Sequence, residues 1–212
     1  MNPPAENPAL LLIVSGPAGS GKTTLCDRLL AEMPRLKRIV TATSREPREG
    51  EMDGEDYYFF DREEFERRIE AGEFFEWARV HDRLYGCLKS EVYGKLERDF
   101  DLILNIDVQG AATFRRQLAE DTRLRDRFVS VFVTPDSLDE IRARLRDRGQ
   151  NSAEEIERRL ANAEGEIDQW VHYDYRIVSR DRESDFLAIS SIYRAEKLRN
   201  RRKILESAAS RR

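Results

Sequence analysis

The chain has 212 residues, of which 40% are apolar, and this is enough for one α/β domain with small insertions and a buried core. Charged residues make up 37%, but 37 Lys and Arg nearly balance 41 Asp and Glu, so the net charge is -4. A general nucleic-acid binder is usually basic overall, and we therefore expect no nucleic-acid partner.

The composition also bears on the compartment. The N-terminal residues carry no basic start and no apolar run, and no stretch approaches the roughly 18 apolar residues of a membrane span. Cys26 and Cys87 lie far apart and lack the close spacing of metal or redox motifs. We expect a cytoplasmic protein with no membrane partner, and the sequence leaves its oligomeric state open.

Apolar runs alternate with helical patterns along the chain. Leu10 to Val14 predicts a buried parallel strand, and a helix from about Lys22 to Met33 follows it. Later strands are expected at 102–106, 128–133 and 177–178. A final helix from about Ser184 would bury a face formed by Phe186, Ile189 and Tyr193. This alternation predicts a doubly wound parallel sheet covered by helices on both faces.

Two segments interrupt this pattern and are expected to be insertions. Residues 41–98 are too polar and too rich in turn residues for a simple crossover. They predict strands at 57–60 and 74–80, with a helix between them that Asp61 caps and that has Glu64 at its third position. Residues 142–159 form an arginine-rich run. The expected division is a tail (1–9), a core (10–40, 99–141 and 160–212) and these two insertions.

A glycine-rich motif follows the first predicted strand. Residues 16–23 match G-x-x-x-x-G-K-[ST] at every fixed position, and glycines let successive backbone N–H groups point at phosphate oxygens. The following helix adds its positive end. Lys22 can reach the β- and γ-phosphates, and the Thr23 hydroxyl can ligate Mg²⁺. The expected triphosphate site comprises Gly16, Pro17, Ala18, Gly19, Ser20, Gly21, Lys22, Thr23 and Thr24.

Asp107 comes directly after the predicted strand at 102–106. Its carboxylate would stand at the C-terminal end of a core strand, where open α/β sheets bind ligands. In P-loop enzymes such an Asp often holds the magnesium shell. The alternative is that Asp107 merely caps the next turn.

Further motifs, together with the glycine-rich loop, resemble the guanylate kinase family in order and spacing. They are 41–51, Asp56-Tyr57, Phe74–Ala78, Tyr85-Gly86, Ile106–Gly110 and Arg148-Gly149. The resemblance covers about Leu10 to Arg199. It implies a P-loop nucleoside monophosphate kinase-like core, with a GMP-binding subdomain at 41–98 and a lid at 142–159. It also implies transfer of the γ-phosphoryl group of ATP to GMP in purine nucleotide metabolism, giving ADP and GDP.

The resemblance implies a binding site for GMP. Arginines and tyrosines would bind its phosphate, because arginine makes forked, charge-assisted bonds to phosphate oxygens. Glu76 would accept from guanine N1–H and the 2-amino group, whereas adenine presents an acceptor at N1 and would leave this carboxylate underpaired. The implied residues are Thr41, Arg45, Arg48, Tyr57, Glu76, Tyr85, Cys87 and Asp107.

The chain departs from the family pattern at three of these or neighbouring positions. Cys87 stands where the family usually has Ser or Thr, and a thiol is a poor hydrogen-bond partner. Asn105 stands where the family usually has Asp, which removes a negative charge near the metal. Ser179 lies where the family commonly has Asn close to the adenine of ATP.

The implied catalytic residues are all cationic: Lys22, Arg45, Arg148 and Arg159, with Arg144 a weaker candidate. Phosphoryl transfer depends mainly on alignment and electrostatic stabilisation, so these charges suit the reaction. Arg142 and Arg146 should lie on a solvated face. Mg²⁺ is the implied cofactor, bound with ATP by Thr23 and Asp107. No general base is assigned, because the GMP phosphate oxygen is already an anion.

Two rival functions are compatible with parts of this pattern. A kinase for another small molecule, such as a sugar phosphate, could use the same core, but the residues matching the GMP site count against it. A non-catalytic binding module is the other rival. Such a module would be expected to lose parts of the phosphate loop, whereas Gly21, Lys22 and Thr23 are intact.

Overall fold

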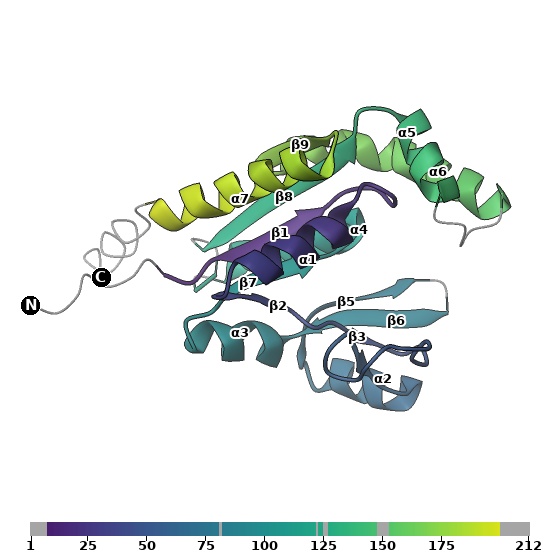
Figure 1. Ribbon diagram of the computed structural model, residues 1–212. Helices are drawn as coiled ribbons and strands as arrows, with labels where there is room; N and C mark the ends of the chain where they lie inside the picture. The colour runs from purple at the N-terminus through teal and green to yellow at the C-terminus, as the bar shows by residue number, and fades with distance from the viewer. Residues whose placement is uncertain (1–7, 81, 122, 125–126, 148–152, 200–212) are drawn as a thin grey trace, which may run out of the picture.

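The computed structural model describes residues 8–80, 82–121, 123–124, 127–147 and 153–199, which form two sheets (Figure 1). The larger sheet is parallel throughout, with strand order β2-β7-β1-β8-β9. Its strands are β1 (Leu11–Ser15), β2 (Leu36–Arg38), β7 (Asp101–Asn105), β8 (Phe128–Pro135) and β9 (Tyr175–Ser179). The predicted parallel core is therefore confirmed. The short edge strand β2 was not predicted, because it offers no buried apolar run.

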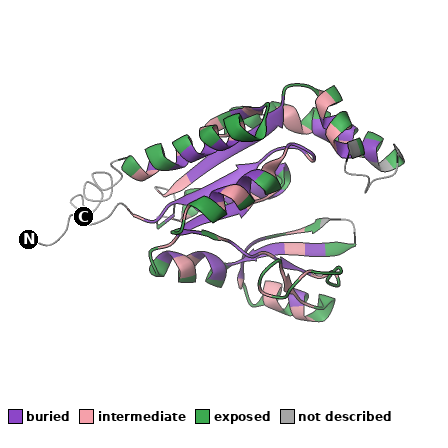
Figure 2. Cartoon of the chain, viewed as in Figure 1, coloured by how far each residue is buried: buried purple, intermediate pink, exposed green. Residues whose placement is uncertain are grey.

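Helices cover both faces of this sheet, as predicted. Leu12 and Val14 of β1 face a cluster completed by α1 (Lys22–Glu32) and α7 (Arg182–Leu198), whereas Leu11 and Ile13 face the opposite cluster. The second cluster contains residues of α3 (Lys89–Glu97) and α4 (Val108–Glu120). Figure 2 shows the central strands as buried along their length. Successive residues of a strand point to opposite faces, so a continuous apolar run serves both clusters.

The smaller sheet comes from the segment between β2 and α3. It has four strands in the order β4-β3-β6-β5 and packs against α2. The elements are β3 (Ala42–Thr43), β4 (Tyr58–Phe59), α2 (Arg62–Glu70), β5 (Phe74–Val80) and β6 (Arg83–Leu88). The Asp61 side chain accepts a 2.7 Å hydrogen bond from the Glu64 N–H, as predicted, while the Glu64 carboxylate pairs with Arg67 and Arg68 instead. One half of the expected capping box therefore forms.

Two contacts attach the smaller sheet to the core. Phe75 of β5 stacks on Phe114 of α4 with ring centroids 4.4 Å apart. The buried Glu91 of α3 accepts from the Val40 N–H at 2.9 Å and from the Tyr58 hydroxyl at 2.8 Å. Since Val40 lies two residues before β3, Glu91 ties the segment that enters this sheet to the core.

The helices α5 (Leu138–Asp147) and α6 (Ala153–Ile167) pack together through a small apolar cluster. Its buried members are Ile141, Leu145, Ile156, Leu160 and Ala163. The predicted insertion at 142–159 therefore spans parts of both helices. A short 3-10 helix, η1 (Asp168–His172), follows α6. Within the described residues, no helix combines the length and apolarity that a membrane span requires.

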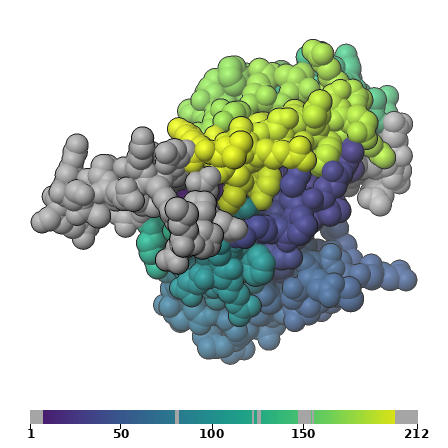
Figure 3. Space-filling view, turned by 60° about the vertical axis from the view of Figure 1, so that its left-hand side comes forward, coloured from purple at the N-terminus to yellow at the C-terminus, as the bar shows by residue number. Residues whose placement is uncertain are grey.

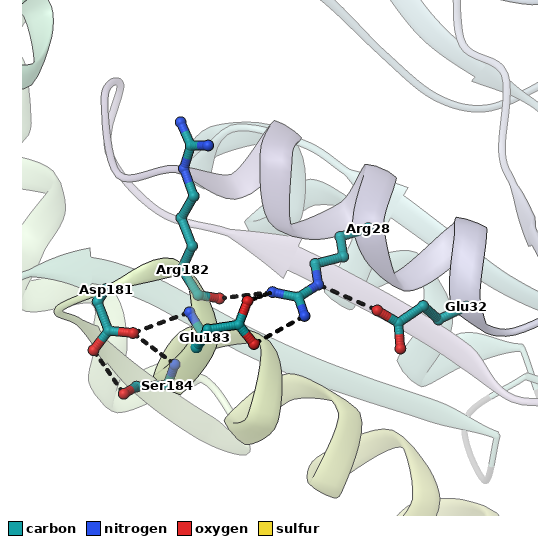
Figure 4. Close-up of polar contacts among 6 residues, drawn as sticks. All are labelled: Arg28, Glu32, Asp181, Arg182, Glu183 and Ser184. Atoms are coloured by element: carbon teal, nitrogen blue, oxygen red, sulfur yellow. Dashed lines mark hydrogen bonds and ion pairs between the residues drawn. The ribbon is translucent and has the colours of Figure 1, made fainter.

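Helix α7 begins two residues before its predicted start and lies against α1 (Figure 3). Asp181 caps it by accepting from the N–H groups of Glu183 and Ser184. Arg28 of α1 donates to both Glu183 oxygens, at 2.7 and 3.0 Å (Figure 4). The predicted apolar face of α7 is confirmed, because Phe186, Ile189 and Tyr193 are all buried.

Asp101, at the start of β7, is fully buried and holds α7 to the sheet. It accepts from the Leu10 N–H at 2.7 Å, the Tyr193 hydroxyl at 2.6 Å and the Lys197 ammonium at 2.8 Å. A buried carboxylate without such partners would be strongly destabilising, so these three donors stabilise the charge together.

Replacing Asp101 by Ala should lower the free energy of unfolding by about 3 to 5 kcal/mol, because Lys197 and Tyr193 lose their buried partner. Urea unfolding followed by circular dichroism measures the change. Glu66→Ala is the control, since it breaks an exposed pair with Arg62 that is worth about 0.5 kcal/mol or less. Equal losses in the two variants would contradict the role assigned to Asp101.

Candidate functional site

The glycine-rich loop connects β1 to α1, as predicted. Gly16, Gly19 and Gly21 have φ angles of 142°, 83° and 94°, a region that side chains with a Cβ rarely occupy. A Cβ on Gly16 would also lie 2.0 Å from the carbonyl oxygen of Val133 on β8. The loop therefore requires glycine both for its turn and for its close approach to the sheet.

Lys22 reaches back over the loop from the first turn of α1. Its ammonium group donates to the carbonyl oxygens of Gly16 at 2.7 Å and Pro17 at 2.8 Å. Thr23 and Thr24 are exposed on the same turn. A cation and the positive end of a helix thus meet at one concave backbone, which is the arrangement that binds phosphate groups.

Two cavities flank the carboxyl edge of the larger sheet. The first has a volume of about 250 Å³ and lies between the smaller sheet and the β7–α4 turn. Among its lining residues are Thr41, Tyr57, Glu76, Tyr85, Asn105 and Asp107. The second, of about 590 Å³, borders the glycine-rich loop, α5 and the start of α7. The structure therefore brings five residues of the predicted GMP site to a single cavity.

Glu76 is 5% exposed, yet its carboxylate receives no hydrogen bond from any described residue. Burial, with a smaller contribution from the charge of Asp107, raises its pKa to about 8. An unpaired carboxylate at the wall of a cavity is costly in the absence of a ligand. It is suited to a ligand that presents N–H donors.

Arg45 and Arg48 are not among the residues that line this cavity, but Arg45 lies over the ring of Tyr57, which does line it, and Glu51 contacts both arginines. The Arg45 guanidinium donates to both Glu51 oxygens, at 2.6 and 2.7 Å, and lies 5.0 Å from the centre of the Tyr57 ring. The Arg48 N–H donates to the same carboxylate at 2.8 Å. The hydrogen bonds from Arg45 are the main reason that the pKa of Glu51 falls to about 2. Glu51 thus occupies the side of the Arg45 guanidinium group to which a phosphate would bind.

The residues predicted for the metal gather at the start of α1 and the end of β7. The Asn105 amide donates to the Thr23 hydroxyl at 3.1 Å, and Asp107 is exposed. Asp107 also caps α4 by accepting from the Gly110 N–H at 2.7 Å, as the alternative reading expected. The described residues contain no cluster of three His, Cys, Asp or Glu side chains. One or two protein ligands suit Mg²⁺, which usually takes its other ligands from water and phosphates.

Cys87 is the predicted GMP-site residue that the structure places differently. Its side chain is fully buried in the apolar cluster beside α3 and α4, and Cys87 is not among the described residues lining the cavity. It pairs across the strands with Glu76, so the two positions are neighbours. Burial raises the pKa of its thiol, which therefore behaves as an apolar side chain.

The arginines of 142–159 are divided between several environments. Arg148 lies outside the described residues, and Arg159 is half-buried on α6. Arg146 is exposed, as predicted, while Arg142 is half-buried and pairs with Asp139 and Glu157. Arg144, the weaker candidate, lies directly beside the phosphate loop, where it donates to the Ser20 carbonyl oxygen at 3.4 Å.

Sequence reasoning missed two carboxylates. Glu51 was noted within a motif but given no role, although its spacing from two arginines is short enough to suggest an ion pair. Glu166 of α6 comes near Lys22 and Asp107, whose charges act on its pKa; burial is the largest cause and raises it. No local pattern could have indicated Glu166, because only the packing of α6 in the folded protein brings it near the loop.

The protein has a parallel sheet covered by helices, a glycine-rich phosphate loop at the carboxyl edge of the sheet, and a cavity beside that loop. These features define a P-loop phosphotransferase. The family profile described as guanylate kinase matches residues 9–196. The chain belongs to the guanylate kinase family and is a nucleotide-binding kinase.

Named relatives and a solved structure agree with this assignment. The guanylate kinase of Maricaulis maris is 42% identical over 91% of this chain and 86% of its own length, and that of Cereibacter sphaeroides is 44% identical over 91% and 89%. The crystal structure of guanylate kinase from Anaplasma phagocytophilum superposes with a TM-score of 0.70 at 33% identity, covering 95% of both chains.

Glu76→Gln should stabilise the nucleotide-free protein, and increasingly so as the pH rises from about 5 to 8. Native Glu76 keeps its proton up to a pKa of about 8, whereas the unfolded chain loses it near 4.5. Unfolding therefore releases a proton between these values, and wild-type stability falls at up to about 1.4 kcal/mol per pH unit. The glutamine variant lacks this loss.

Thermal midpoints at pH 5, 6.5 and 8 measure the effect, with Glu63→Gln on the exposed face of α2 as control. A constant difference between Glu76→Gln and wild type across this range would contradict the raised pKa.

Proposed function

We propose that the protein transfers the γ-phosphoryl group of ATP to GMP, forming ADP and GDP. The observation that carries this proposal is the buried, unpaired carboxylate of Glu76 in the smaller cavity. Membership in the guanylate kinase family supports the same acceptor.

Guanine suits this carboxylate because N1–H and the 2-amino group donate side by side, and one carboxylate can accept from both. Binding would favour the ionised form of Glu76 and displace its proton. Adenine presents an acceptor at N1, which the ionised Glu76 carboxylate cannot satisfy, so this form would leave a buried group unpaired at a cost of about 1 to 3 kcal/mol or more.

The phosphate of GMP would be held by Arg45, Arg48, Tyr57 and Tyr85. Tyr57 and Tyr85 are in edge contact and line the cavity, and Arg45 lies over the Tyr57 ring. In this arrangement the incoming phosphate replaces Glu51 as the partner of the Arg45 guanidinium. An already oriented guanidinium loses less freedom on binding than a solvated one.

The triphosphate of ATP would occupy the loop of residues 16–23, with Lys22 directed at its β- and γ-phosphates. Thr23 and Asp107 would hold Mg²⁺, which neutralises charge on the transferring oxygens when it is bound. Arg159 and Arg148 would approach the same phosphates from the α5–α6 side, with 142–159 acting as a lid and 41–98 as the GMP-binding subdomain. The GMP phosphate is an anion and needs no general base.

The cellular setting is also a proposal: a cytoplasmic enzyme of purine nucleotide metabolism. Both cysteines are free thiols, which suits a reducing compartment. The net charge of -4 supports small-molecule substrates over nucleic acid as partners.

A nucleotide-acceptor panel tests the reaction. With ATP and Mg²⁺, GMP should be phosphorylated at least about 100-fold faster than AMP, CMP or UMP, because the wrong base leaves Glu76 unsatisfied. Glu76→Gln should lower kcat/KM for GMP by roughly 100-fold while the dissociation constant of ATP stays within twofold. Comparable rates with AMP would overturn the assignment, and tight peptide binding without turnover would favour a binding module.

Arg45→Lys tests the phosphate site separately from the base site. Lysine cannot make the forked bond, so we expect the KM for GMP to rise about 10- to 100-fold with the KM for ATP unchanged. Initial rates over a matrix of both substrates separate these constants. Arg62→Lys, an exposed arginine paired with Glu66, is the control. Equal increases in both KM values would place Arg45 outside the acceptor site.

A further inference from the structure

Three side chains from different elements connect α7 to the phosphate loop. Ser179, the last residue of β9, is 1% exposed, and its hydroxyl donates to the Asp185 carboxylate at 2.6 Å. The same hydroxyl oxygen accepts from the Arg144 guanidinium at 2.9 Å. Arg144 in turn donates to the Ser20 carbonyl oxygen in the loop. A hydroxyl has one proton, so donation to Asp185 fixes its lone pairs toward Arg144.

Arg144 has a further partner on its own helix, bound through its other terminal nitrogen. Glu140, one turn earlier on α5, also accepts from its guanidinium. Without Ser179 and Asp185, the ion pair with Glu140 would draw the guanidinium along α5. Ser179 and the Ser20 carbonyl oxygen therefore bind the nitrogen that faces the loop, while Glu140 binds the nitrogen that faces along α5. The larger cavity, lined by Gly19, Gly21 and Arg144, lies at this point.

We propose that Asp185, acting through Ser179, is a positioning residue that holds Arg144 against the phosphate loop, ready to contact the phosphates of the donor nucleotide. The inference rests on the proposed function in taking a nucleoside triphosphate as the ligand of the loop. It does not depend on the acceptor. Neither Asp185 nor Ser179 touches the reacting atoms.

The start of α7 does not depend on Asp185, so the residue can be changed without removing the helix. Asp181 caps its first turn, and Arg28 clamps Glu183 (Figure 4). Among the described residues, the Asp185 carboxylate accepts one further hydrogen bond, from the backbone N–H of Arg180 at 3.0 Å. An asparagine can keep this bond through its oxygen. Its amide would then donate to Ser179 and deprive the hydroxyl of its acceptor.

A double-mutant cycle tests the relay by calorimetry of ATP with Mg²⁺ and no acceptor. Asp185→Asn and Ser179→Ala should each weaken ATP binding about 5- to 10-fold, as expected for one weakened charge-assisted bond. In an Arg144→Met background neither change should weaken it further. With GMP present, kcat should fall by a similar factor while the KM for GMP stays within twofold.

The control Asp27→Asn removes the same charge from α1, where Asp27 pairs with Arg38 outside both cavities, and should leave ATP affinity unchanged. Circular dichroism and thermal midpoints establish that each variant is folded. The proposal is overturned if Asp185→Asn binds ATP like wild type, or if it weakens binding equally in the Arg144→Met background. Failure of wild type to phosphorylate GMP would instead reject the proposed function, and the calorimetric cycle would still decide the relay.

Discussion

The site depends on how closely the Gly16 backbone approaches β8. The Val133 carbonyl oxygen occupies the space where a Cβ of residue 16 would lie. Because residue 16 is glycine, the chain can stay against the sheet as it turns from β1 into α1. Since β1 lies between β7 and β8, the loop opens onto both neighbours. The smaller cavity adjoins the end of β7, and the larger one adjoins α5 and the end of β9. The two cavities thus lie on either side of the phosphate loop.

Three cationic side chains around the two cavities have partners within the protein. Lys22 is bound to loop carbonyl oxygens, Arg45 to Glu51, and Arg144 to Ser179. These partners orient the charges before a phosphate arrives, which is the property that makes electrostatic stabilisation effective in phosphoryl transfer. Glu76 is the opposite case. Its carboxyl group has no hydrogen-bond partner among the described residues, and its burial raises its pKa to about 8.

The smaller sheet carries Glu76 and is attached to the core by side chains of several elements. Phe75 stacks on α4, Cys87 packs in the core cluster, and Glu91 accepts from the Val40 N–H and the Tyr58 hydroxyl. The two neighbours Phe75 and Glu76 therefore serve different purposes, one as an apolar anchor and the other as a wall of the cavity. Side chains alternate in direction along β5, and the pairing of β5 with β6 is irregular between Phe74 and Glu76. Together these features separate the side chains of Phe75 and Glu76.

By itself, the sequence determined the parallel core, the phosphate loop and the buried face of α7, because each depends on a local run or spacing. It also indicated the residues around Glu76 through their motifs. Only the tertiary structure decided that Cys87 packs in the core and that Arg144 and Ser179 meet beside the loop. Those outcomes join elements far apart in the chain, and the packing of whole helices on the sheet sets them, which no local pattern specifies.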